Sequence, residues 1–163
     1  MSQSFSIDKL PVRWTIEIGT HATVEALVAD IEASGAKLGD WARALLSKVT
    51  VSPVRRTLRL VAPSVAELGF TKATSLGDIH ARAIETYGLA LTPSEGGLQL
   101  RRQYTTQPKS EWLLMAMEAL EDSYSELGAF TVARDFNVRW VNADNGHPDD
   151  LYVPDSRLVF VLP

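Results

Sequence analysis

The chain has 163 residues, of which 45% are hydrophobic and 22% are charged, and it contains no cysteine. This length fits a single domain over residues 1–163, and the composition is typical of a globular protein and not of a disordered one. The formal net charge of −4 disfavours a dedicated nucleic-acid-binding protein, which concentrates Lys and Arg on one face. The lack of cysteine excludes disulfide bonds and thiolate chemistry.

The start of the chain and its apolar stretches predict a cytoplasmic protein without a membrane segment. Residues 1–12 include Asp8 and Pro11 and lack the apolar run of a signal peptide, so we expect a partly ordered N-terminal arm there. The longest apolar stretches are Trp112–Met117 and Leu158–Leu162. Both are far shorter than the about 20 residues that cross a bilayer as a helix.

Two short strands are predicted in the first half of the chain. Residues 13–18 alternate between polar and large apolar side chains, as in a half-buried strand. Residues 58–62 alternate in the same way, and Pro63 ends that strand or places it at a sheet edge. Ser64 and Glu67 follow with the spacing of a capping box, which predicts one helical turn.

Three helices are predicted before Gly88. Thr23 is the expected N-cap of the first helix, and Asp40 precedes the second, shorter one. Ser75 and Asp78 have the spacing of a weaker capping box at the start of the third helix, and Gly88 terminates it. These helices need a sheet, or each other, to cover their apolar stripes.

Beyond Gly88, strand-like runs separated by turn signals predict a mainly antiparallel sheet. The predicted strands are residues 98–104, Trp112–Met117, Phe130–Ala133, Val138–Val141 and Leu158–Leu162. The Leu, Met and Ala residues of the second run would equally suit a helix. The polar segment Asn142–Asp150 is predicted to be the longest loop of this half. The expected fold class is α+β, with a C-terminal-half meander packed by about three helices from the N-terminal half.

Several segments together resemble an uncharacterised family of bacterial proteins, over most of the chain from Trp14 to Phe160. The segments that carry the resemblance are Trp14–Thr20, Gly39–Ala42, Val65–Phe70, Gly88–Glu95, Leu100-Arg101, Gln103-Tyr104, Gln107-Pro108, Glu111–Leu113, Ala116–Glu118 and Gly146–Asp149. This resemblance implies one domain and a bacterial context, and it carries over no activity and no site residue.

A polar segment between Ser94 and Glu111 supplies most of the candidate contacts with a ligand or a partner. The candidates are Glu95, Arg101, Gln103, Tyr104, Gln107, His147 and Asp149. In a strand, Arg102 and Tyr104 share the inward face with the leucines, while Arg101 and Gln103 face outward. An inward Arg102 requires a paired carboxylate, a wet edge or a bulge. The more common explanation of such a segment is a polar strand face that guards a sheet edge.

The sequence offers little support for a metal site or a cofactor, and we expect none. The three histidines, His21, His80 and His147, lie in distant segments without the spacing of metal ligands. The segment Asn142–Asp150 is rich in oxygen ligands, but it fails the EF-hand pattern because Val153 stands where the closing Glu is needed. Turn formation explains its composition better.

These observations favour a non-catalytic protein that binds another protein or a small ligand through the predicted hairpin bearing Arg101 and Tyr104. One alternative is an enzyme of unknown class, for example a hydrolase, with a cleft formed by five of the candidates: Glu95, Arg101, Tyr104, His147 and Asp149. A second alternative is a subunit of a homo-oligomer, which would expose an apolar patch or an unpaired strand. Nucleic acid is an unlikely partner because of the acidic charge balance.

Overall fold

The computed structural model describes residues 10–163, so residues 1–9 of the predicted N-terminal arm lie outside the described part. In that part the helices are α1 (Val24–Ala33), α2 (Asp40–Leu45), η2 (Leu46–Lys48), α3 (Leu76–Tyr87) and α4 (Gly96–Gln103). The strands are β1 (Trp14–Ile18), β2 (Lys37–Leu38), β3 (Arg56–Val61), β4 (Thr74–Ser75), β5 (Trp112–Met115), β6 (Leu120–Glu121), β7 (Leu127–Asp135), β8 (Val138–Asn145), β9 (Leu151–Tyr152) and β10 (Arg157–Leu162). Within residues 10–163, no helix has the length and apolar character needed to cross a membrane.

One large, mostly antiparallel sheet organises the molecule. Its strand order is β1-β3-β10-β5-β7-β8-β2, and β6 pairs with β7 beside this path. The β10–β5 and β8–β2 pairs are parallel, and the short strands β4 and β9 form a separate two-stranded sheet. The predicted α+β class is confirmed. The sheet differs from a simple meander because β10 lies between β3 and β5.

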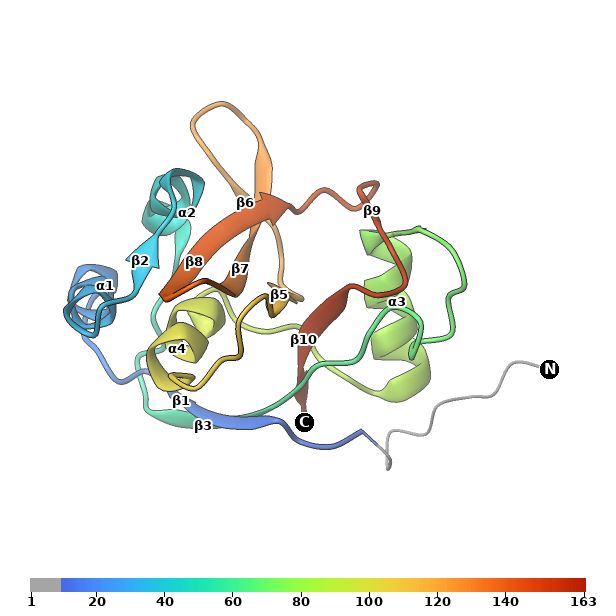
Figure 1. Cartoon of the computed structure of the whole chain (residues 1–163), viewed down its shortest axis with the longest axis horizontal. Coiled ribbons are helices and arrows are strands. Elements are labelled where there is room, and N and C mark those ends of the chain that lie inside the picture. Colours follow the sequence, from blue (N-terminus) through green and yellow to red (C-terminus); the bar gives the residue numbers. More distant parts are fainter. Residues whose placement is uncertain (1–9) are drawn as a thin grey trace.

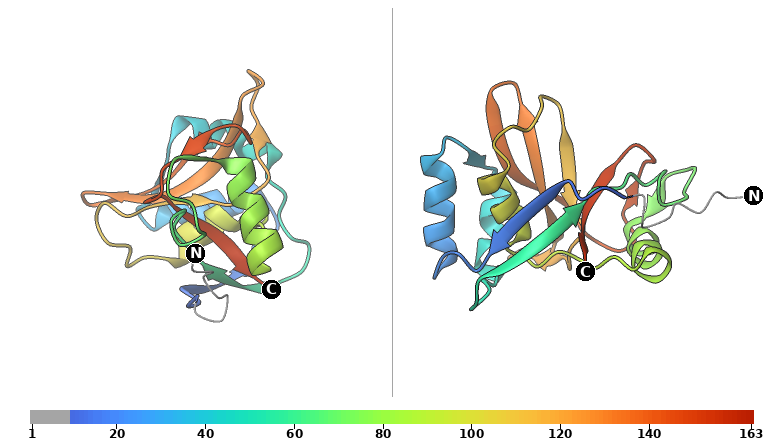
Figure 2. Two further views of the ribbon diagram at one scale, coloured as in Figure 1. Left: turned by 90° about the vertical axis from the view of Figure 1, so that its right-hand side faces the viewer. Right: turned by 90° about the horizontal axis from the view of Figure 1, so that it is seen from below.

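The helices lie at different places around the sheet and do not form a single layer. Figure 1 shows α1 and α2 at one end of the molecule beside β2, and α3 at the other end beside β9 and β10. Helix α4 lies between them and packs against β1, β7, β8 and α1. Because β1 and β8 are near opposite ends of the strand order, the sheet curls around α4, as the views in Figure 2 show.

The register of β5, β7 and β8 assigns each side chain to one of two faces. Leu113, Val132 and Val141 are paired across the three strands and are fully buried. Phe130 shares the face of Val132 and meets α4 at Gly97, where an added Cβ atom would lie 2.9 Å from the Cβ atom of Phe130. Gly97 therefore allows α4 to pack directly on the sheet. Neighbours in sequence, such as Ala133, point to the opposite face.

Several local predictions are confirmed at the level of hydrogen bonds. The Thr23 hydroxyl accepts the Ala26 N–H at 3.1 Å, as expected of the α1 N-cap. Helix α3 ends at Gly88, whose φ of +68° places it in the left-handed region that favours glycine. Ser64 and Glu67 exchange the two bonds of a capping box, at 3.3 and 3.1 Å, although only a turn follows them.

The prediction of a strand over residues 98–104 is wrong, because this segment forms α4. The polar side chains Glu95, Gln99 and Gln103 recur every four residues and occupy one side of the helix. Leu98 and Leu100 suggested the alternation of a strand, but both are buried because α4 is enclosed by the curled sheet. The predicted hairpin bearing Arg101 and Tyr104 therefore does not exist.

The prediction of a long loop over Asn142–Asp150 is wrong for its first four residues, which belong to β8. Pairing of β7 with β8 continues to Gly128 and Asn145, so β8 extends well beyond the predicted end at Val141. Polar residues are tolerated in this part of β8 because one face of the strand is not covered by α4. Only residues 146–150 connect β8 to β9.

Candidate functional site

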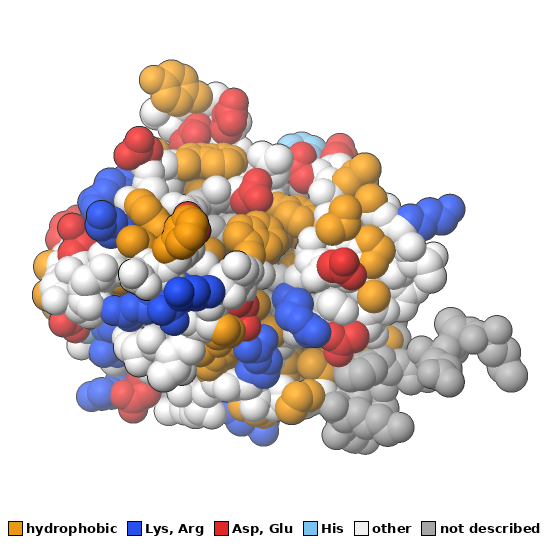
Figure 3. Space-filling model, in the orientation of Figure 1, with side chains coloured by type: hydrophobic (Ala, Val, Ile, Leu, Met, Phe, Trp, Pro, Cys, Tyr) orange, Lys and Arg blue, Asp and Glu red, His pale blue; other side chains and the backbone are white. Residues whose placement is uncertain are grey.

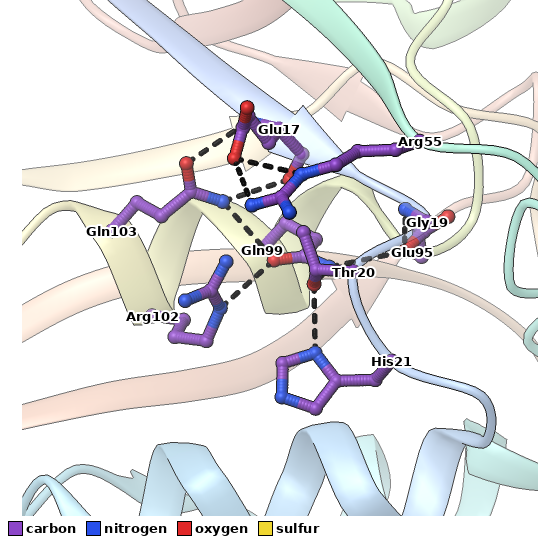
Figure 4. A network of polar contacts seen from close by, with 9 residues as sticks. All are labelled: Glu17, Gly19, Thr20, His21, Arg55, Glu95, Gln99, Arg102 and Gln103. Carbon is purple, nitrogen blue, oxygen red and sulfur yellow. Dashed lines mark hydrogen bonds and ion pairs between the residues drawn. The ribbon is translucent and has the colours of Figure 1, made fainter.

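The candidate Glu95 lies at the start of α4 and is fully buried. Its Oε1 atom accepts the Ser52 N–H at 2.7 Å. Its Oε2 atom accepts the Gly19 N–H at 3.2 Å (Figure 4). The Gln99 amide donates to the same Oε2 atom at 3.2 Å. Hydrogen bonds from backbone N–H groups stabilise a carboxylate out of water. Glu95 thus joins α4 to the end of β1 and to the loop before β3.

The candidate Gln103 hydrogen-bonds to the edge of β1 that does not pair with β3. Its Nε2 atom donates to the Glu17 carbonyl at 2.8 Å, and its Oε1 atom accepts the Glu17 N–H at 2.9 Å (Figure 4). One side-chain amide therefore satisfies both outward backbone groups of Glu17, as a neighbouring strand would do. Blocking an edge in this way prevents pairing with another chain.

A hydroxyl, an imidazole and a carboxylate are also joined near α4, through His21. The Nδ1 atom of His21 lies 2.7 Å from the Thr20 hydroxyl, and its Nε2 atom lies 3.1 Å from the Asp30 carboxylate. This connectivity is that of a nucleophile, base and orienting acid. However, the Thr20 hydroxyl also accepts a 2.8 Å hydrogen bond from Gln99. We assign these residues to the attachment of α1 and β1 to α4.

The candidate Arg101 is fully buried, and its partners are neutral amide and backbone carbonyl oxygen atoms, not a carboxylate. Its Nη1 atom donates to Gln107 Oε1 at 2.6 Å and to the Ala133 carbonyl at 3.0 Å. Its Nη2 atom donates to the Tyr104 carbonyl at 2.6 Å, and the Trp140 carbonyl lies 3.4 Å from Nη1. Burial lowers the pKa of Arg101 to about 10. Arg101 is therefore a structural cation that supports β7 and β8 from the α4 side.

The candidates Tyr104 and Gln107 converge on Glu111, a residue that was not among the candidates. The Tyr104 hydroxyl donates to Glu111 Oε1 at 2.9 Å, and the Gln107 amide lies 3.3 Å from the same atom. Arg13 forms an ion pair with Glu111 Oε2 at 3.0 Å. Burial, followed by the hydrogen bond to Glu111, raises the pKa of Tyr104. The Glu111 side chain keeps 18% of its surface exposed. Its carboxylate is therefore fixed by Tyr104, Gln107 and Arg13 and still partly faces solvent.

Glu111 lies beside a row of three side chains on the sheet face opposite α4. Trp112 pairs with Ala133 across β5 and β7, and Ala133 pairs with Trp140 across β7 and β8. Paired residues of adjacent strands point to the same face, so the two indoles flank a methyl group. Their strands are separated by one strand, which places the two backbones about 10 Å apart.

This row forms the floor and walls of an open hollow of about 470 Å³, which we call the tryptophan groove. Its lining residues are Glu111, Trp112, Ala133, Arg134, Trp140 and Asn142, with Ser110 and Asp135 at the margin. The lining combines two large aromatic surfaces with polar residues, among which Arg134 donates from Nε and Nη1 to the Phe136 and Gln107 carbonyls. Such a mixture of an apolar surface and a few placed polar groups is typical of a ligand site.

Contacts behind the two indoles fix their positions. Trp112 stacks on Tyr152 with 6.3 Å between ring centroids and 25° between the planes. The Tyr152 hydroxyl donates to the Asn145 carbonyl at 2.5 Å, and burial raises the pKa of Tyr152. The Lys37 ammonium lies 6.0 Å from the Trp140 ring, on the strand β2 that borders β8. Tyr152 therefore supports the Trp112 indole from outside the groove lining.

The molecular surface has no single sign of charge on the face drawn in Figure 3. Hydrophobic side chains are exposed near its centre, and Lys and Arg side chains are interspersed with acidic and neutral ones. The groove itself carries Glu111 and Asp135 against Arg134. This balance differs from the continuous basic surface of a nucleic-acid-binding face.

The remaining candidates, His147 and Asp149, lie in the connection after β8 and belong to a separate group. The Asp149 N–H donates to His147 Nδ1 at 3.0 Å, and both side chains are exposed. Among residues 10–163, no group of three or more His, Asp or Glu side chains is arranged to hold a metal ion. The five residues of the predicted enzyme cleft thus fall into three groups: Glu95 with Gly19 and Ser52, Arg101 with Tyr104, and His147 with Asp149.

Sequence reasoning missed Glu111 and the tryptophan row as a site. In the sequence, Glu111 is only the end of the polar segment. Trp14, Trp41, Trp112 and Trp140 could stack on sugars or bases, but at their alternating or helical positions a core role is more common. Trp112 is the exposed first residue of β5, and the apolar run Trp112–Met117 gives no sign of this exposure. The pairing of Trp112 with Ala133 and Trp140 is a property of the sheet register and is not visible in the chain.

Comparison of the chain with protein-family models, with curated proteins and with solved structures finds no match. The resemblance to an uncharacterised bacterial family therefore stays a prediction.

Proposed function

We propose that the protein is a non-catalytic carbohydrate-binding protein and that the tryptophan groove holds a neutral saccharide. The observation that carries this proposal is the row formed by Trp112, Ala133 and Trp140 across three adjacent strands. Two indoles separated by a small residue leave room for one ring between or above them. Aromatic side chains offer a large rigid surface to the C–H face of such a ring.

The polar groups of the groove match the other half of a saccharide, its hydroxyl groups. A sugar hydroxyl both donates and accepts a hydrogen bond, so its site needs acceptors and donors together. The Glu111 carboxylate supplies acceptors and the Asn142 amide supplies both, while Arg134 keeps only part of its donors, because its Nε and Nη1 atoms already donate to the Phe136 and Gln107 carbonyls. Three side chains already orient Glu111, namely Arg13, Tyr104 and Gln107. Little ordering of this carboxylate is required when a ligand binds.

A second hollow extends the groove on the other side of Trp112. It has a volume of about 400 Å³, shares Ser110, Glu111 and Trp112 with the groove, and also contacts Val153 and Arg157. Trp112 therefore forms a ridge between two adjoining hollows. A chain of two or more sugar units laid across this ridge would use both, which favours an oligosaccharide over a single sugar.

Other ligand classes fit the groove less well. A nucleotide brings phosphate charge next to Glu111 and Asp135, with Arg134 the single cation of the lining. An extended peptide adds to an open strand edge, whereas the groove lies on the face of the sheet. The open edge of β1 is already bonded to Gln103 at Glu17.

The test is isothermal titration calorimetry with a panel of neutral mono- and oligosaccharides, with nucleotides as a comparison. We expect oligosaccharides to bind more tightly than their monosaccharides and nucleotides not to bind. Trp112→Ala and Trp140→Ala are each expected to weaken binding roughly 10- to 100-fold, since aromatic anchors contribute about 2 kcal/mol or more. Tyr124→Ala is the matched control, because Tyr124 is 86% exposed on the β6–β7 connection and should not affect affinity.

Two results would overturn the proposal. One is that no saccharide of the panel binds. The other is a saccharide whose affinity is the same in the wild type and in both tryptophan variants. Capture of a protein partner that depends on Trp112 and Trp140 would assign the same face to protein recognition instead.

A further inference from the structure

A further hollow lies at the start of α3 and shares no lining residue with the tryptophan groove. It has a volume of about 300 Å³, at the lower end of the range for small-molecule sites. Most of its lining is apolar and comes from Leu76, Met117, Ala119, Leu127 and Pro148. Its one imidazole belongs to His80 of α3. We call this hollow the His80 pocket.

His80 brings to this pocket a nitrogen atom that lacks a hydrogen bond within the described part of the chain. Its Nε2 atom is buried and has no hydrogen-bond partner among residues 10–163. Burial lowers the pKa of His80 to about 4, so the ring is neutral near pH 7. A neutral imidazole offers one N–H donor and one nitrogen acceptor. A buried polar atom without a partner destabilises the protein, and a ligand that binds this atom relieves that penalty.

The walls of the His80 pocket disfavour an anionic occupant. The N–H groups of Leu76 and Gly77 at the start of α3 donate to the carbonyls of Asp150 and Pro148, at 2.8 and 2.9 Å. The Ser75 hydroxyl accepts the Asp78 N–H, so these helix N-terminal donors are occupied and do not hold an anion. Glu118 is the acidic residue of the lining, and it is exposed at the rim, which disfavours an anion further.

Contacts around the pocket favour a flat aromatic occupant. The Phe130 N–H lies 3.4 Å from the Met117 sulfur, which fixes this thioether at the pocket wall. Thioether sulfur makes favourable contacts with aromatic rings. His80 already packs edge-on against Phe160, with 6.1 Å between ring centroids. The pocket therefore has apolar walls, a fixed sulfur and one neutral hydrogen-bonding ring.

We infer that the His80 pocket is a binding site for a small, uncharged aromatic molecule that carries one hydroxyl or N–H group. Phenol and indole represent this class. The ring contacts Leu76, Met117 and Pro148, and the polar group hydrogen-bonds to the His80 imidazole, whose buried Nε2 atom must turn toward the hollow when the ligand binds. This site is independent of the carbohydrate-binding function proposed for the tryptophan groove.

The test is titration of the full chain with phenol, indole, toluene and benzoate, followed by amide NMR shifts and by thermal unfolding. We expect phenol and indole to shift the amides of Gly77, His80 and Gly146 and to raise the unfolding temperature. Toluene, which lacks the polar group, should bind about 3- to 10-fold more weakly, and benzoate should bind at least 10-fold more weakly than phenol.

Variants distinguish this site from non-specific binding. His80→Phe keeps a ring in place but removes the nitrogen atoms, so it should reduce phenol affinity to that of toluene. His147→Phe is the matched control on an exposed loop and should leave phenol affinity unchanged. Ala119→Leu fills the pocket and should abolish binding of every probe, which provides a test even if His80→Phe is unstable.

Three results would overturn the inference. They are the absence of shifts at the pocket amides with all probes, equal affinities for phenol and benzoate, and phenol binding that Ala119→Leu leaves unchanged. Trp112→Ala should not affect phenol binding. A loss of phenol binding in Trp112→Ala would show that the probe binds in the tryptophan groove and would also overturn the inference.

Discussion

The two faces of the sheet formed by β5, β7 and β8 use polar side chains in different ways. On the face that α4 covers, Glu95, Arg101 and Gln107 are fully buried, and each is hydrogen-bonded to several groups of the chain. On the opposite face, Trp112 and Trp140 flank Ala133 in the open groove. The Glu111 carboxylate, next to Trp112, is held from the α4 side by Tyr104 and Gln107 but stays partly exposed.

This difference separates residues that build the fold from residues that are free to bind. A buried charge is tolerated when most of its hydrogen bonds are satisfied, so the side chains around α4 have little capacity left for a ligand. Arg101 meets this condition through Nη1 and Nη2, although its buried Nε atom has no partner among residues 10–163. The groove side chains are held in place by residues behind them, and their outer surfaces remain open. Arg101 links the two faces, because it binds the carbonyls of Ala133 and Trp140 from beneath the groove.

The largest effect that this comparison predicts is for Arg101→Met. The substitution keeps most of the side-chain volume but leaves Gln107 Oε1 and the Tyr104 carbonyl without their donor. Unsatisfied buried acceptors cost about 1–3 kcal/mol each, so we expect the free energy of unfolding to fall by about 3 kcal/mol. Chemical denaturation followed by circular dichroism measures this change.

Arg102→Met is the matched control for this experiment. Arg102 is partly exposed, and its Nε atom donates to Gln99 at 3.0 Å. We expect a loss below about 1 kcal/mol, as for ordinary surface polar contacts. If both variants lose the same stability, Arg101 has no special structural role and the distinction between the two faces does not hold.

A smaller loss of stability is expected for Glu95→Gln at the start of α4. The carboxylate accepts three N–H groups, and a glutamine would point its own N–H₂ group at one of these donors. We expect the free energy of unfolding to fall by about 2 kcal/mol. Ser94→Ala, next in the chain, removes exposed hydrogen bonds with Thr50 and should change it by about 0.5 kcal/mol. A Glu95→Gln variant as stable as Ser94→Ala would contradict this assignment.

Tyr104→Phe tests the connection between the two faces. The variant loses the 2.9 Å hydrogen bond to Glu111 but keeps the ring, which packs 5.1 Å from Trp14. A hydrogen bond to a charged group at a half-buried position contributes about 1 kcal/mol, and we expect a loss of that size in thermal unfolding. Tyr124→Phe is the control, because this exposed hydroxyl should have no effect. Saccharide affinity should fall a few-fold in Tyr104→Phe alone, because Glu111 becomes less ordered.

The sequence predicted the parts of the fold that local chemistry determines. The helix between Ser75 and Gly88 was delimited correctly because a side-chain cap and a left-handed glycine act within a few residues. Helix α4 was missed because Gly96 and Gly97 have low helix propensity, and because the packing that stabilises this helix comes from distant strands. The amide spacing of Gln99 and Gln103 was the local sign that favoured a helix.

The candidate site was less predictable than the fold, because it depends on sheet register. Arg101 and Glu95 were chosen as candidates for their chemistry, and the structure uses them as internal supports. The tryptophan groove requires Trp112 and Trp140 to flank Ala133, and this arrangement follows from pairing between strands that are far apart in the chain. Polar residue type alone does not distinguish a support from a binding group.

Ala133→Leu should give the smallest change in stability and a large change in binding. Ala133 is half-buried between the two indoles, and a leucine there projects into the open groove without displacing core residues. We expect the free energy of unfolding to change by about 0.5 kcal/mol, as for other surface substitutions. The added side chain occupies the position of the sugar ring, so saccharide affinity should fall roughly 100-fold in calorimetry. Thr15→Leu, an exposed strand position on β1, is the matched control and should leave affinity unchanged. Full saccharide affinity in Ala133→Leu would place the ligand outside the groove. The face of the sheet that bears the two tryptophans would then bind no ligand, and it would not differ in function from the face that α4 covers.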